Sequence, residues 1–324
     1  MPVRNGGAFL AGAVQSILDQ SLQEFELLLV DDHSSDGAID RLHRNDDRLV
    51  VLSHEGAGVS SAFNAGLARA RGQFIARMDA DDIASRDRLE QQVSFLRLHE
   101  DIDICGACVE IFSEQKIAGG NERYQAWLNN LRTPQAIRRE MFIESPIPNP
   151  TAMFRSTALR SLGGFHDPEW PEDYDLYLRA DARGIKMGKP PGCLLRWREH
   201  PGRLTRTEDR YSQGNFQAAK AHYLANSRLP AGEPVVIWGA GPGGRLMHDL
   251  LQGEGTAIKG FLDIHPRRIG GQKRGLPIWP LDKLSALVDS FILVAVGTAG
   301  VRPEIREFMD RHARIAGEDY LFVA

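Results

Sequence analysis

The sequence predicts an α/β protein made of two blocks, in each of which helices cover a largely parallel sheet. Short apolar runs alternate along the chain with segments whose apolar residues recur at helical spacing, which is the pattern of strands and helices in turn. Turn-forming clusters follow the apolar runs, as they do where parallel strands end. The length of 324 residues leaves room for two hydrophobic cores. We therefore expect one domain at 1–208, a helical linker at 209–233 and a second domain at 234–324.

The elements of the first block follow from this alternation. Residues 8–20 have apolar side chains at helical spacing, and the apolar run 25–30 ends in the turn cluster DDHSSDG, which is typical of a buried strand. The same criteria predict, in chain order, a strand at 48–52, a helix at 60–71, a strand at 73–78, a helix at 85–100 and a strand at 103–112. The chain itself opens on MPVRNGG rather than on an apolar run, so the first strand is either a stub or belongs to a chain whose start was cut or assigned late.

The second block shows the same alternation. The apolar run 234–238 is followed by a glycine-rich turn and by a helical pattern at 246–251. Further strands are predicted at 258–262, 291–296 and 320–323. Between the blocks, residues 209–226 predict a polar helix, and the sequence PAGE at 230–233 marks the boundary. In both blocks we expect the functional loops at the carboxyl ends of the strands.

Composition excludes several classes of protein. The 39 Lys and Arg residues against 43 Asp and Glu leave a net charge of −4, so we expect no nucleic-acid partner. No apolar run reaches the roughly 18 residues of a spanning helix, and the N-terminus lacks a signal-peptide pattern, so neither an integral membrane protein nor a secreted one is expected. Three cysteines cannot form a disulfide framework. These features together predict a cytoplasmic location.

A dense group of carboxylates follows one of the predicted strands. Asp79, Asp81 and Asp82 come directly after the strand at 73–78, and crowded carboxylates repel one another unless a cation lies among them. Their oxygens suit a hard divalent ion, Mg2+ or Mn2+, which commonly binds diphosphate oxygens as well. Taken alone, the pattern is explained at least as well by a solvated acidic loop that leads into the helix at 85–100.

Two further acidic clusters favour a shared site. Asp31 and Asp32 follow the strand at 25–30. Glu172 and Asp173 stand at the start of a helical pattern, where the helix macrodipole alone would also favour them. Three acidic clusters in one block of a nearly neutral protein are explained more simply by one site than by three unrelated surface features.

These motifs occur in the order seen in the family 2 glycosyltransferases, which the first block resembles over residues 1–210. The resemblance is carried by PVRNG at 2–6, VDDHSSDG at 30–37, GVSSAFNAG at 58–66, MDADD at 78–82, GGF at 163–165 and EDYD at 172–175. It implies the GT-A nucleotide-sugar-binding fold and inverting transfer of a sugar from a nucleotide-sugar, with a UDP-sugar as the expected donor. The implied acceptor is a glycan or a lipid-linked glycan in bacterial surface polysaccharide synthesis, which also allows peripheral association with the inner face of the membrane.

The resemblance implies a role on the donor side for four of the carboxylates. Asp31 and Asp32 are expected at the base and ribose of the nucleotide, and Asp79 near the ribose. Asp81 is expected to ligate the metal, which neutralises charge on the leaving diphosphate. The metal ligands would then be Asp81 and Asp79, joined by His200 unless that side chain touches the diphosphate instead.

On the acceptor side, the resemblance implies that Asp173 is the general base, taking a proton from the acceptor hydroxyl as it attacks the anomeric carbon. Glu172 would position the acceptor or the base. The sequence RWREHPGRLTR at 196–206 resembles the loop that follows the base in this family. Arg203 and Arg206 are expected to hold phosphate oxygens there, unless the loop is merely solvated.

Three residues of the first block stand apart from this scheme. Relatives often carry arginine where this chain has Phe63, so a charge contact there is missing or supplied from elsewhere. Cys105 and Cys108 have the C-x-x-C spacing of redox and zinc sites. Because the chain holds no second cysteine pair and their context is that of a strand, we expect them to be small apolar core residues.

The second block contains a glycine motif typical of nucleotide sites. Gly239, Gly241 and Gly244 form G-x-G-x-x-G between a strand and a helix, and Asp263 ends the next strand. We predict a Rossmann-like domain in which a phosphate lies at the helix N-terminus and Asp263 meets a ribose. The block resembles the small nucleotide- or sugar-nucleotide-binding domains of some bacterial sugar-modifying enzymes. The alternative is that the glycines only let the helix pack on the strand.

At this level three functions are distinguishable. The leading interpretation is an active, metal-dependent inverting glycosyltransferase, because every key carboxylate is present. The alternative is an inactive glycosyltransferase-like protein whose second domain binds a nucleotide or nucleotide-sugar. An NAD(P)-dependent oxidoreductase is not favoured, since it depends on the glycine motif alone and the second block carries no catalytic half.

Overall fold

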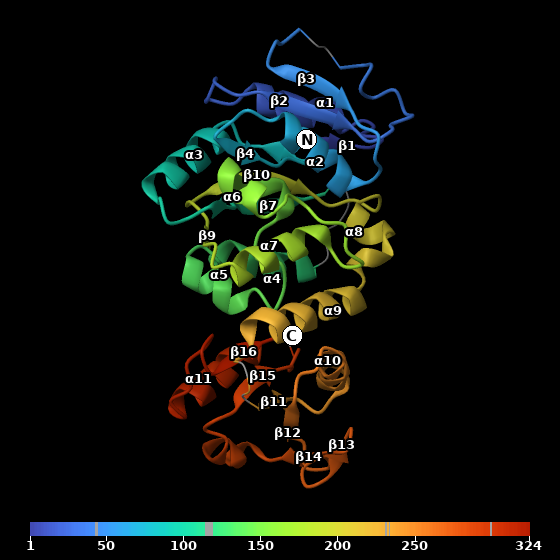
Figure 1. Cartoon of the computed structure of the whole chain (residues 1–324). Helices are drawn as coiled ribbons and strands as arrows, with labels where there is room; N and C mark the ends of the chain where they lie inside the picture. The colour runs from blue at the N-terminus through green and yellow to red at the C-terminus, as the bar shows by residue number, and fades with distance from the viewer. Residues whose placement is uncertain (43–44, 114–118, 231, 233, 299) are drawn as a thin grey trace. The chain divides into compact units, whose positions relative to one another are not determined.

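The computed structural model describes residues 1–42, 45–113, 119–230, 232, 234–298 and 300–324, and it divides the chain into two compact units (Figure 1). Unit 1 comprises Met1–Ile137 and Pro146–Asp209. Unit 2 comprises Arg138–Ser145 and Arg210–Ala324. The helical segment that follows residue 209 therefore packs as part of unit 2, and so does a short stretch from the middle of the chain.

The first sheet of unit 1 is parallel. Its strands β1 (Pro2–Val3), β2 (Leu27–Asp31) and β3 (Leu49–Ser53) lie in the order β1-β2-β3. The first strand is thus a stub of two residues. Before it, the amino group of Met1 donates a hydrogen bond to the carbonyl of Leu28 at 2.8 Å, and burial lowers the pKa of that amino group to about 5.

Unit 1 also contains two mixed sheets. In sheet order, their strands are β4 (Phe74–Ala76), β8 (Met153–Arg155), β6 (Ile104–Cys105) and β9 (Met187–Gly188) in one, and β5 (Ile83–Ala84), β10 (Cys193–Arg198) and β7 (Cys108–Phe112) in the other. Strands β4 and β6 run antiparallel to β8, whereas β6 runs parallel to β9. Strand β10 runs parallel to β7 and antiparallel to β5.

The prediction of one strand over 103–112 is wrong, because the chain leaves one sheet after β6 and enters another at β7. The peptide groups at the crossing are held by side chains: the Ala107 N–H donates to Thr151 Oγ1 at 3.1 Å, and Gln92 donates to the Gly106 carbonyl at 3.2 Å. The prediction that Cys105 and Cys108 are core residues is confirmed, since both are buried free thiols.

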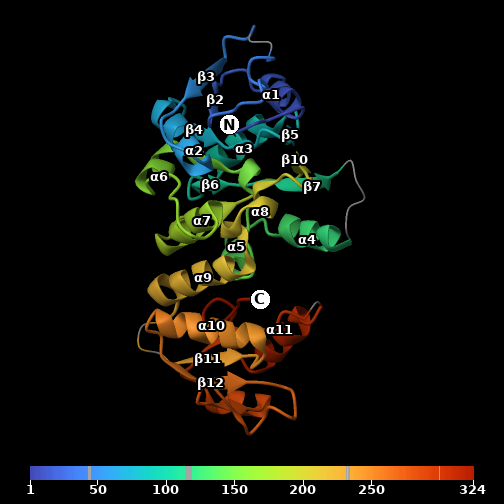
Figure 2. The same cartoon turned by 90° about the vertical axis from the view of Figure 1, so that its right-hand side faces the viewer.

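The helices of unit 1 alternate with its strands. They are α1 (Leu10–Leu18), α2 (Val59–Arg69), α3 (Arg88–Leu98), α4 (Gly119–Asn130), α6 (Ser156–Ser161), α7 (Glu172–Ala182) and α8 (Leu204–Thr207), with 3-10 turns at Asn149–Thr151 and Asp209–Tyr211, while α5 (Pro134–Glu140) continues into unit 2. The helices predicted at 8–20, 60–71 and 85–100 are confirmed as α1, α2 and α3. Helix α2, which Figure 2 labels, packs against β1 and β2. The N–H of Gly58, the residue before the helix, donates to Asp32 directly after β2, so the N-terminus of α2 lies beside the end of that strand.

An apolar cavity of about 290 Å³ lies inside unit 1. Its lining includes side chains from β2, β4 and α3, among them Leu27, Phe74 and Leu89. None of the acidic clusters recognised in the sequence lines it. A site for a charged ligand must therefore be sought at the strand ends rather than in this cavity.

Unit 2 is built on one six-stranded sheet with the order β13-β14-β12-β11-β15-β16. Its elements are α9 (Gln213–Tyr223), a π-helical turn (Leu224–Arg228), β11 (Val235–Trp238), α10 (Pro242–Gly253), β12 (Ile258–Leu262), β13 (Gln272–Lys273), β14 (Leu276–Trp279), a 3-10 helix (Leu281–Ala286), β15 (Phe291–Val294), α11 (Arg302–Arg311) and β16 (Tyr320–Phe322). All the pairings are parallel except that of β13 with β14. Counted from β11, the parallel strands follow the 3-2-1-4-5 order of a doubly wound sheet.

A buried lysine joins separate parts of unit 2. The Nζ of Lys220 on α9 donates to the carbonyl of Ile143 at 2.8 Å and to that of Val323 at 3.1 Å. Burial lowers the pKa of this lysine to about 8. The contacts explain why the segment Arg138–Ser145 belongs to unit 2, because its backbone satisfies a charged group that would otherwise be buried alone.

Candidate functional site

The acidic loop after β4 forms a compact cluster in the structure. Ligand oxygens of Asp79, Asp81 and Asp82 all lie within 4.8 Å of one another. The side chains of Asp79 and Asp81 are about one-third exposed, whereas Asp82 is buried. Asp79 also forms an ion pair with the buried guanidinium of Arg77. The sequence therefore places three carboxylates around one point, two of them open to solvent and one beneath them.

Asp82 is the member of this cluster whose contacts do not offset the cost of burying its carboxylate. Its Oδ1 accepts a hydrogen bond from the Arg198 N–H at 2.7 Å, but its Oδ2 is buried without a partner among the described residues. Burial, and then the charges of Asp79 and Asp81, raise the pKa of Asp82 well above its usual range. A buried oxygen left without a hydrogen bond is costly, and a cation held among the three carboxylates would satisfy it.

The end of strand β10 and the loop that follows it contact the acidic cluster. His200 Nε2 lies 2.9 Å from Asp81 Oδ2, and the guanidinium of Arg198 donates to the Asp81 carbonyl at 2.8 Å. Burial and the charge of Asp79 raise the pKa of Asp81 although its hydrogen bond with His200 opposes that shift. The ring of Phe9 packs against both side chains, at 5.2 Å from the His200 ring and 4.3 Å from the Arg198 guanidinium.

The two arginines predicted to hold phosphate oxygens are engaged with a carboxylate that the sequence analysis did not consider. Arg203 donates to Glu199 Oε2 at 2.9 Å, and Arg206 donates to Glu199 Oε1 at 2.9 and 2.6 Å. The charge of Arg203 also acts on Asp81 and on its buried neighbour. Binding a phosphate there would require at least one arginine to exchange Glu199 for the ligand.

The first turn of α7 belongs to the same electrostatic environment. Glu172 is buried and Asp173 is half-buried. The charges of Asp173, Glu172 and Asp79 all act on the phenol of Tyr177, which is buried with no hydrogen-bond partner for its hydroxyl among the described residues. Burial first, and then Asp173, raise the pKa of Tyr177 well above its usual range.

Arg77 connects the two acidic segments. It pairs with Asp79 and also interacts with the charge of Glu172. Arg77 therefore links one predicted metal ligand to Glu172, the neighbour of the predicted base on α7. The sequence motif gave no indication of Arg77 or Tyr177, because each lies inside an otherwise ordinary strand or helix pattern.

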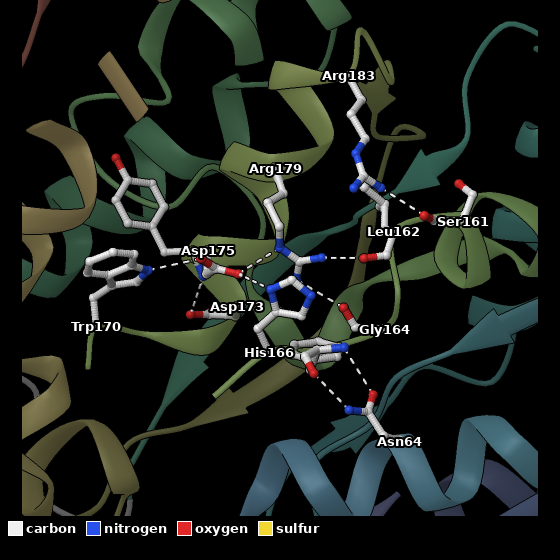
Figure 3. Close-up of polar contacts among 12 residues, drawn as sticks. Asn64, Ser161, Leu162, Gly164, His166, Trp170, Asp173, Asp175, Arg179 and Arg183 are labelled. Atoms are coloured by element: carbon white, nitrogen blue, oxygen red, sulfur yellow. Dashed lines mark hydrogen bonds and ion pairs between the residues drawn. The ribbon is translucent and has the colours of Figure 1, made fainter. Parts of the chain in front are cut away.

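A hydrogen-bond network fixes the start of α7 (Figure 3). The Asp175 carboxylate accepts from Trp170 Nε1 at 3.0 Å and from Arg179 Nε at 2.8 Å. Arg179 also donates to the carbonyls of Leu162 at 2.5 Å and Gly164 at 3.0 Å. The network thus anchors the glycine loop before α7 to the helix turn that carries Glu172 and Asp173.

The same loop is held from the other side by α2. Asn64 donates to the Phe165 carbonyl at 2.7 Å and accepts from the Phe165 N–H at 3.0 Å, as Figure 3 shows. Gly164 has φ +71°, and a Cβ there would lie 2.4 Å from Asn64 Oδ1, so glycine is required. Phe63 packs edge-on against Phe165, with 4.6 Å between the ring centroids.

The carboxylates after β2 make contacts of their own. Asp31 Oδ1 accepts from the Ser34 N–H at 2.9 Å. Both oxygens of the buried Asp32 accept from the Gly58 N–H, at 3.0 and 3.1 Å, and its Oδ1 lies 3.3 Å from His54 Nε2. Asp31 and Asp32 thus shape the loops at the carboxyl end of β2, with Asp31 half-buried and Asp32 buried.

The glycine motif of unit 2 has a different role for each of its members. Gly239 has φ +117°, and a Cβ at Gly244 would lie 1.7 Å from the Gly239 carbonyl oxygen, so these two glycines serve the packing of α10 on β11. Gly241 has an ordinary φ of −73° and space around it. The Asp263 carboxylate accepts from the Ala240 N–H at 2.9 Å and from Arg268 at 3.0 Å.

The donor atoms of the acidic cluster fit a hard divalent cation such as Mn2+ or Mg2+. All three ligands are carboxylate oxygens, which these ions prefer, and one of them is buried without a partner among the described residues. With the α7 carboxylates nearby, the arrangement combines a place for a diphosphate with a place for a proton acceptor. That combination suits group transfer from a nucleotide-activated donor.

Comparison with known proteins decides the family. A family model described as glycosyl transferase family 2 matches residues 1–163, half of the chain. The chain belongs to glycosyltransferase family 2. It is an enzyme of the glycosyl-transferring class, and the family predicted from the sequence is confirmed.

Individual relatives of this family 2 glycosyltransferase are distant in sequence. The glycosyltransferase EpsE of Bacillus subtilis is 29% identical over 249 residues, which cover 73% of this chain and 84% of that protein. The amylovoran biosynthesis glycosyltransferase AmsE of Erwinia amylovora is 31% identical over 194 residues, covering 58% of this chain and 70% of that protein.

Solved structures confirm the GT-A fold of this glycosyltransferase. The structure of TarS 1–349 from S. aureus in complex with UDP-GlcNAc matches with a TM-score of 0.56 at 19% identity. The match covers 71% of this chain and 66% of that one.

Within the described residues, no helix combines the length and the apolar character that crossing a membrane requires.

Proposed function

We propose that this chain transfers a sugar from a nucleotide-sugar to a hydroxyl of a glycan or lipid-linked acceptor, in a reaction that needs Mn2+ or Mg2+ and inverts the anomeric centre. The observation that supports this most is that Arg77 links two carboxylate groups with different surroundings. One is the cluster of Asp79, Asp81 and Asp82, and the other is the pair Glu172 and Asp173 at the start of α7.

The acidic cluster is proposed to hold the cation and the donor diphosphate. Asp81 and Asp79 are the exposed ligands, Asp82 is the buried one, and His200 is close enough to Asp81 to join them. A divalent ion bound there supplies charge neutralisation to the departing nucleoside diphosphate. Without it, three carboxylates so close together would repel a diphosphate.

The residues around the cluster complete the donor site. Asp31 and Asp32 are proposed to bind the base and ribose, since they lie at the carboxyl end of β2 where ligands of such sheets bind. Arg203 and Arg206 are proposed to hold phosphate oxygens, releasing Glu199 as they do so. A guanidinium can bind two phosphate oxygens at once, which favours this exchange.

Asp173 is proposed as the general base. It is half-buried at the N-terminus of α7, where the helix dipole stabilises its carboxylate until a proton is taken from the acceptor hydroxyl. Glu172 is buried beside Arg77 and is proposed to position the acceptor or the base. One displacement from the face opposite the leaving group inverts the configuration, so no covalent nucleophile is needed.

The setting proposed for this reaction is synthesis of a bacterial surface polysaccharide at the inner face of the membrane. It follows from the relatives, of which AmsE is named for amylovoran biosynthesis. A UDP-sugar is the donor to test first, because TarS, whose fold unit 1 shares, was solved with UDP-GlcNAc.

A second candidate function concerns unit 2, which we propose binds a nucleotide-containing ligand without redox chemistry. The supporting observation is that Gly241 leaves the N-terminus of the twelve-residue helix α10 open at the end of β11, where free N–H groups favour a phosphate. Asp263 could meet a ribose after releasing Arg268. Titration of the full chain by NMR with UDP, UDP-sugars, NAD and NADP tests this. The absence of shifts at Gly239–Gly244 would contradict it.

Turnover with a panel of nucleotide-sugars tests the main proposal. Release of nucleoside diphosphate is measured with Mn2+ and with excess chelator, and the anomeric configuration of the product is determined by NMR. We expect release only with the metal, and a product of inverted configuration. Equal rates in chelator would contradict the metal role, and a retained configuration would contradict the single displacement.

A further inference from the structure

A second cluster of metal-ligating side chains lies away from the acidic loop, where the loop between β3 and α2 meets the turn after β2. It consists of Asp32, His33 and His54, whose ligand atoms all lie within 4.8 Å of one another. Asp32 and His54 are buried, while His33 is exposed. The cluster therefore has two fixed members and one at the surface.

The orientation of each side chain in this cluster is set by its other polar atom. His33 Nε2 lies 2.7 Å from the Gly56 carbonyl, so this nitrogen donates and Nδ1 is the nitrogen that can bind a metal. His54 Nδ1 lies 3.3 Å from Ser61 Oγ, which leaves Nε2 as the inward nitrogen. Metal-binding histidines are typically oriented in this way, with the second ring nitrogen bonded to a backbone carbonyl or another polar group.

The inward nitrogen of His54 lacks a hydrogen-bond partner. Its side chain is 5% exposed, and Nε2 is buried without a hydrogen bond among the described residues. The nearest carboxylate oxygen, Asp32 Oδ1, is 3.3 Å away in a direction that does not make a hydrogen bond. Two ligands of a tetrahedral zinc ion, each at 2.0–2.1 Å from it, are about 3.3 Å apart. The spacing of this pair therefore matches one edge of such a site.

The geometry points to a transition-metal site formed by Asp32, His33 and His54, with Zn2+ as the ion that its donors favour. Two imidazoles and one carboxylate suit zinc, whereas the all-carboxylate cluster of unit 1 suits Mn2+ or Mg2+. His33 supplies the third ligand from the surface, within 4.8 Å of the other two. Three protein ligands leave a fourth position for water or for an atom of another molecule.

A zinc ion at this place would compete with the nucleotide for Asp32. This consequence rests on the proposed function, in which Asp32 meets the base and ribose. The metal site itself does not rest on it, because the site is argued from the unpartnered nitrogen and the spacing alone. Binding of metal and competition with nucleotide are therefore separate measurements.

Cobalt(II) titration of the full chain tests the metal site, because Co2+ absorbs intensely in the visible when tetrahedral and only weakly when octahedral. Millimolar Mg2+ is present to occupy the acidic cluster. We expect one equivalent of Co2+ to give a tetrahedral spectrum that stoichiometric Zn2+ abolishes. A weak octahedral spectrum, or none, would overturn the proposal.

Variants locate the ligands. His54→Gln and His33→Asn are each expected to weaken Co2+ binding at least 100-fold, since even changes beyond the direct ligands cost 10–100-fold. Asparagine suits position 33, where φ is +59°. The control His99→Gln, on a histidine of the same unit outside the cluster, is expected to bind like the parent. If His54→Gln does not fold, His33→Asn alone tests the site. Co2+ binding by His33→Asn as tight as that of the parent would contradict the site.

Competition with UDP is then measured on the parent protein. UDP with Mg2+ is expected to displace Co2+ and to abolish the tetrahedral spectrum. A tetrahedral spectrum that UDP leaves unchanged, while UDP itself binds, would contradict the role of Asp32 in the donor site and leave the metal site standing. Failure of the metal site would instead appear as the missing spectrum in the first titration.

Discussion

Replacing Asp82 by asparagine is expected to stabilise the metal-free enzyme and to weaken its affinity for Mn2+. The amide keeps the size of the side chain and can still accept from the Arg198 N–H, but it removes one of three charges that lie within 4.8 Å of one another. Two unit charges at 4.8 Å repel by about 3.5 kcal/mol at an effective dielectric constant of about 20. Because the raised pKa of Asp82 lets protonation relieve part of this repulsion, we expect a net gain of about 1–3 kcal/mol in the free energy of unfolding, less than the full repulsion.

The pH dependence of this difference follows from the raised pKa of Asp82. Burial and its carboxylate neighbours make the native state hold a proton that the unfolded chain releases at lower pH. The metal-free parent therefore loses stability as pH rises from the usual carboxyl range through that raised pKa, and the variant does not. The advantage of Asp82→Asn should therefore be small near pH 4 and should grow as the pH rises above the usual carboxyl range.

Thermal and urea unfolding with and without Mn2+ measure the effect. Without metal, the variant should unfold at the higher temperature. With saturating Mn2+, the parent should gain more stability, because the ion binds its native state more tightly and shifts the equilibrium by mass action. If Mn2+ stabilises parent and variant equally, Asp82 is not part of a cation site and the explanation of its unpartnered oxygen is wrong.

Three further variants separate the catalytic, structural and unit 2 roles. Asp173→Asn should lower kcat by about 10²–10⁴-fold in the turnover assay with donor binding unchanged. The control Asp167→Asn, at an exposed position, should behave like the parent. Equal turnover in both variants would show that another residue is the base. Gly164→Ala, at φ +71° and with its Cβ 2.4 Å from a neighbouring amide oxygen, should cost about 2–4 kcal/mol in urea unfolding, and a loss under about 0.5 kcal/mol would mean that the loop adapts. Gly241→Val should abolish nucleotide shifts in unit 2 without lowering its melting temperature, whereas Gly244→Val should unfold it; retained shifts in the first variant would leave only the packing role for the motif.

The parts of the fold that the sequence predicts well are those with clear local patterns. The apolar runs that became β2, β11 and β12 are buried and flanked by turn residues, so periodicity and turn chemistry agree there. The segment 103–112 reads as one strand because nothing local shows that Thr151 and Gln92 hold a crossing between two sheets. Such long-range hydrogen bonds are decided by tertiary packing, which a single sequence does not display.

The candidate site likewise has parts that the sequence predicts and parts that it does not. The motifs around Asp81 and Asp173 are visible in the sequence, because one cluster of carboxylates directly follows a predicted strand and the other begins a helical pattern. Which carboxylate is buried is not visible, and the structure shows that it is Asp82. The ion pairs of Glu199 with Arg203 and Arg206 were not predicted, because both arginines were interpreted as ligands of phosphate or as solvated side chains. A carboxylate spaced for ion pairs with both arginines was the signal that could have revealed them.

Calorimetric titration of the full chain with UDP, in Mn2+ and in excess chelator, is the most direct test of a metal-dependent donor site at the acidic cluster. We predict measurable heat and a saturable isotherm with Mn2+, no binding in chelator, and at least tenfold weaker binding in Asp81→Asn with Mn2+ present. Equal UDP affinity in Mn2+ and in chelator, or an Asp81→Asn variant that binds like the parent, would contradict the assignment of this cluster as the metal and diphosphate site.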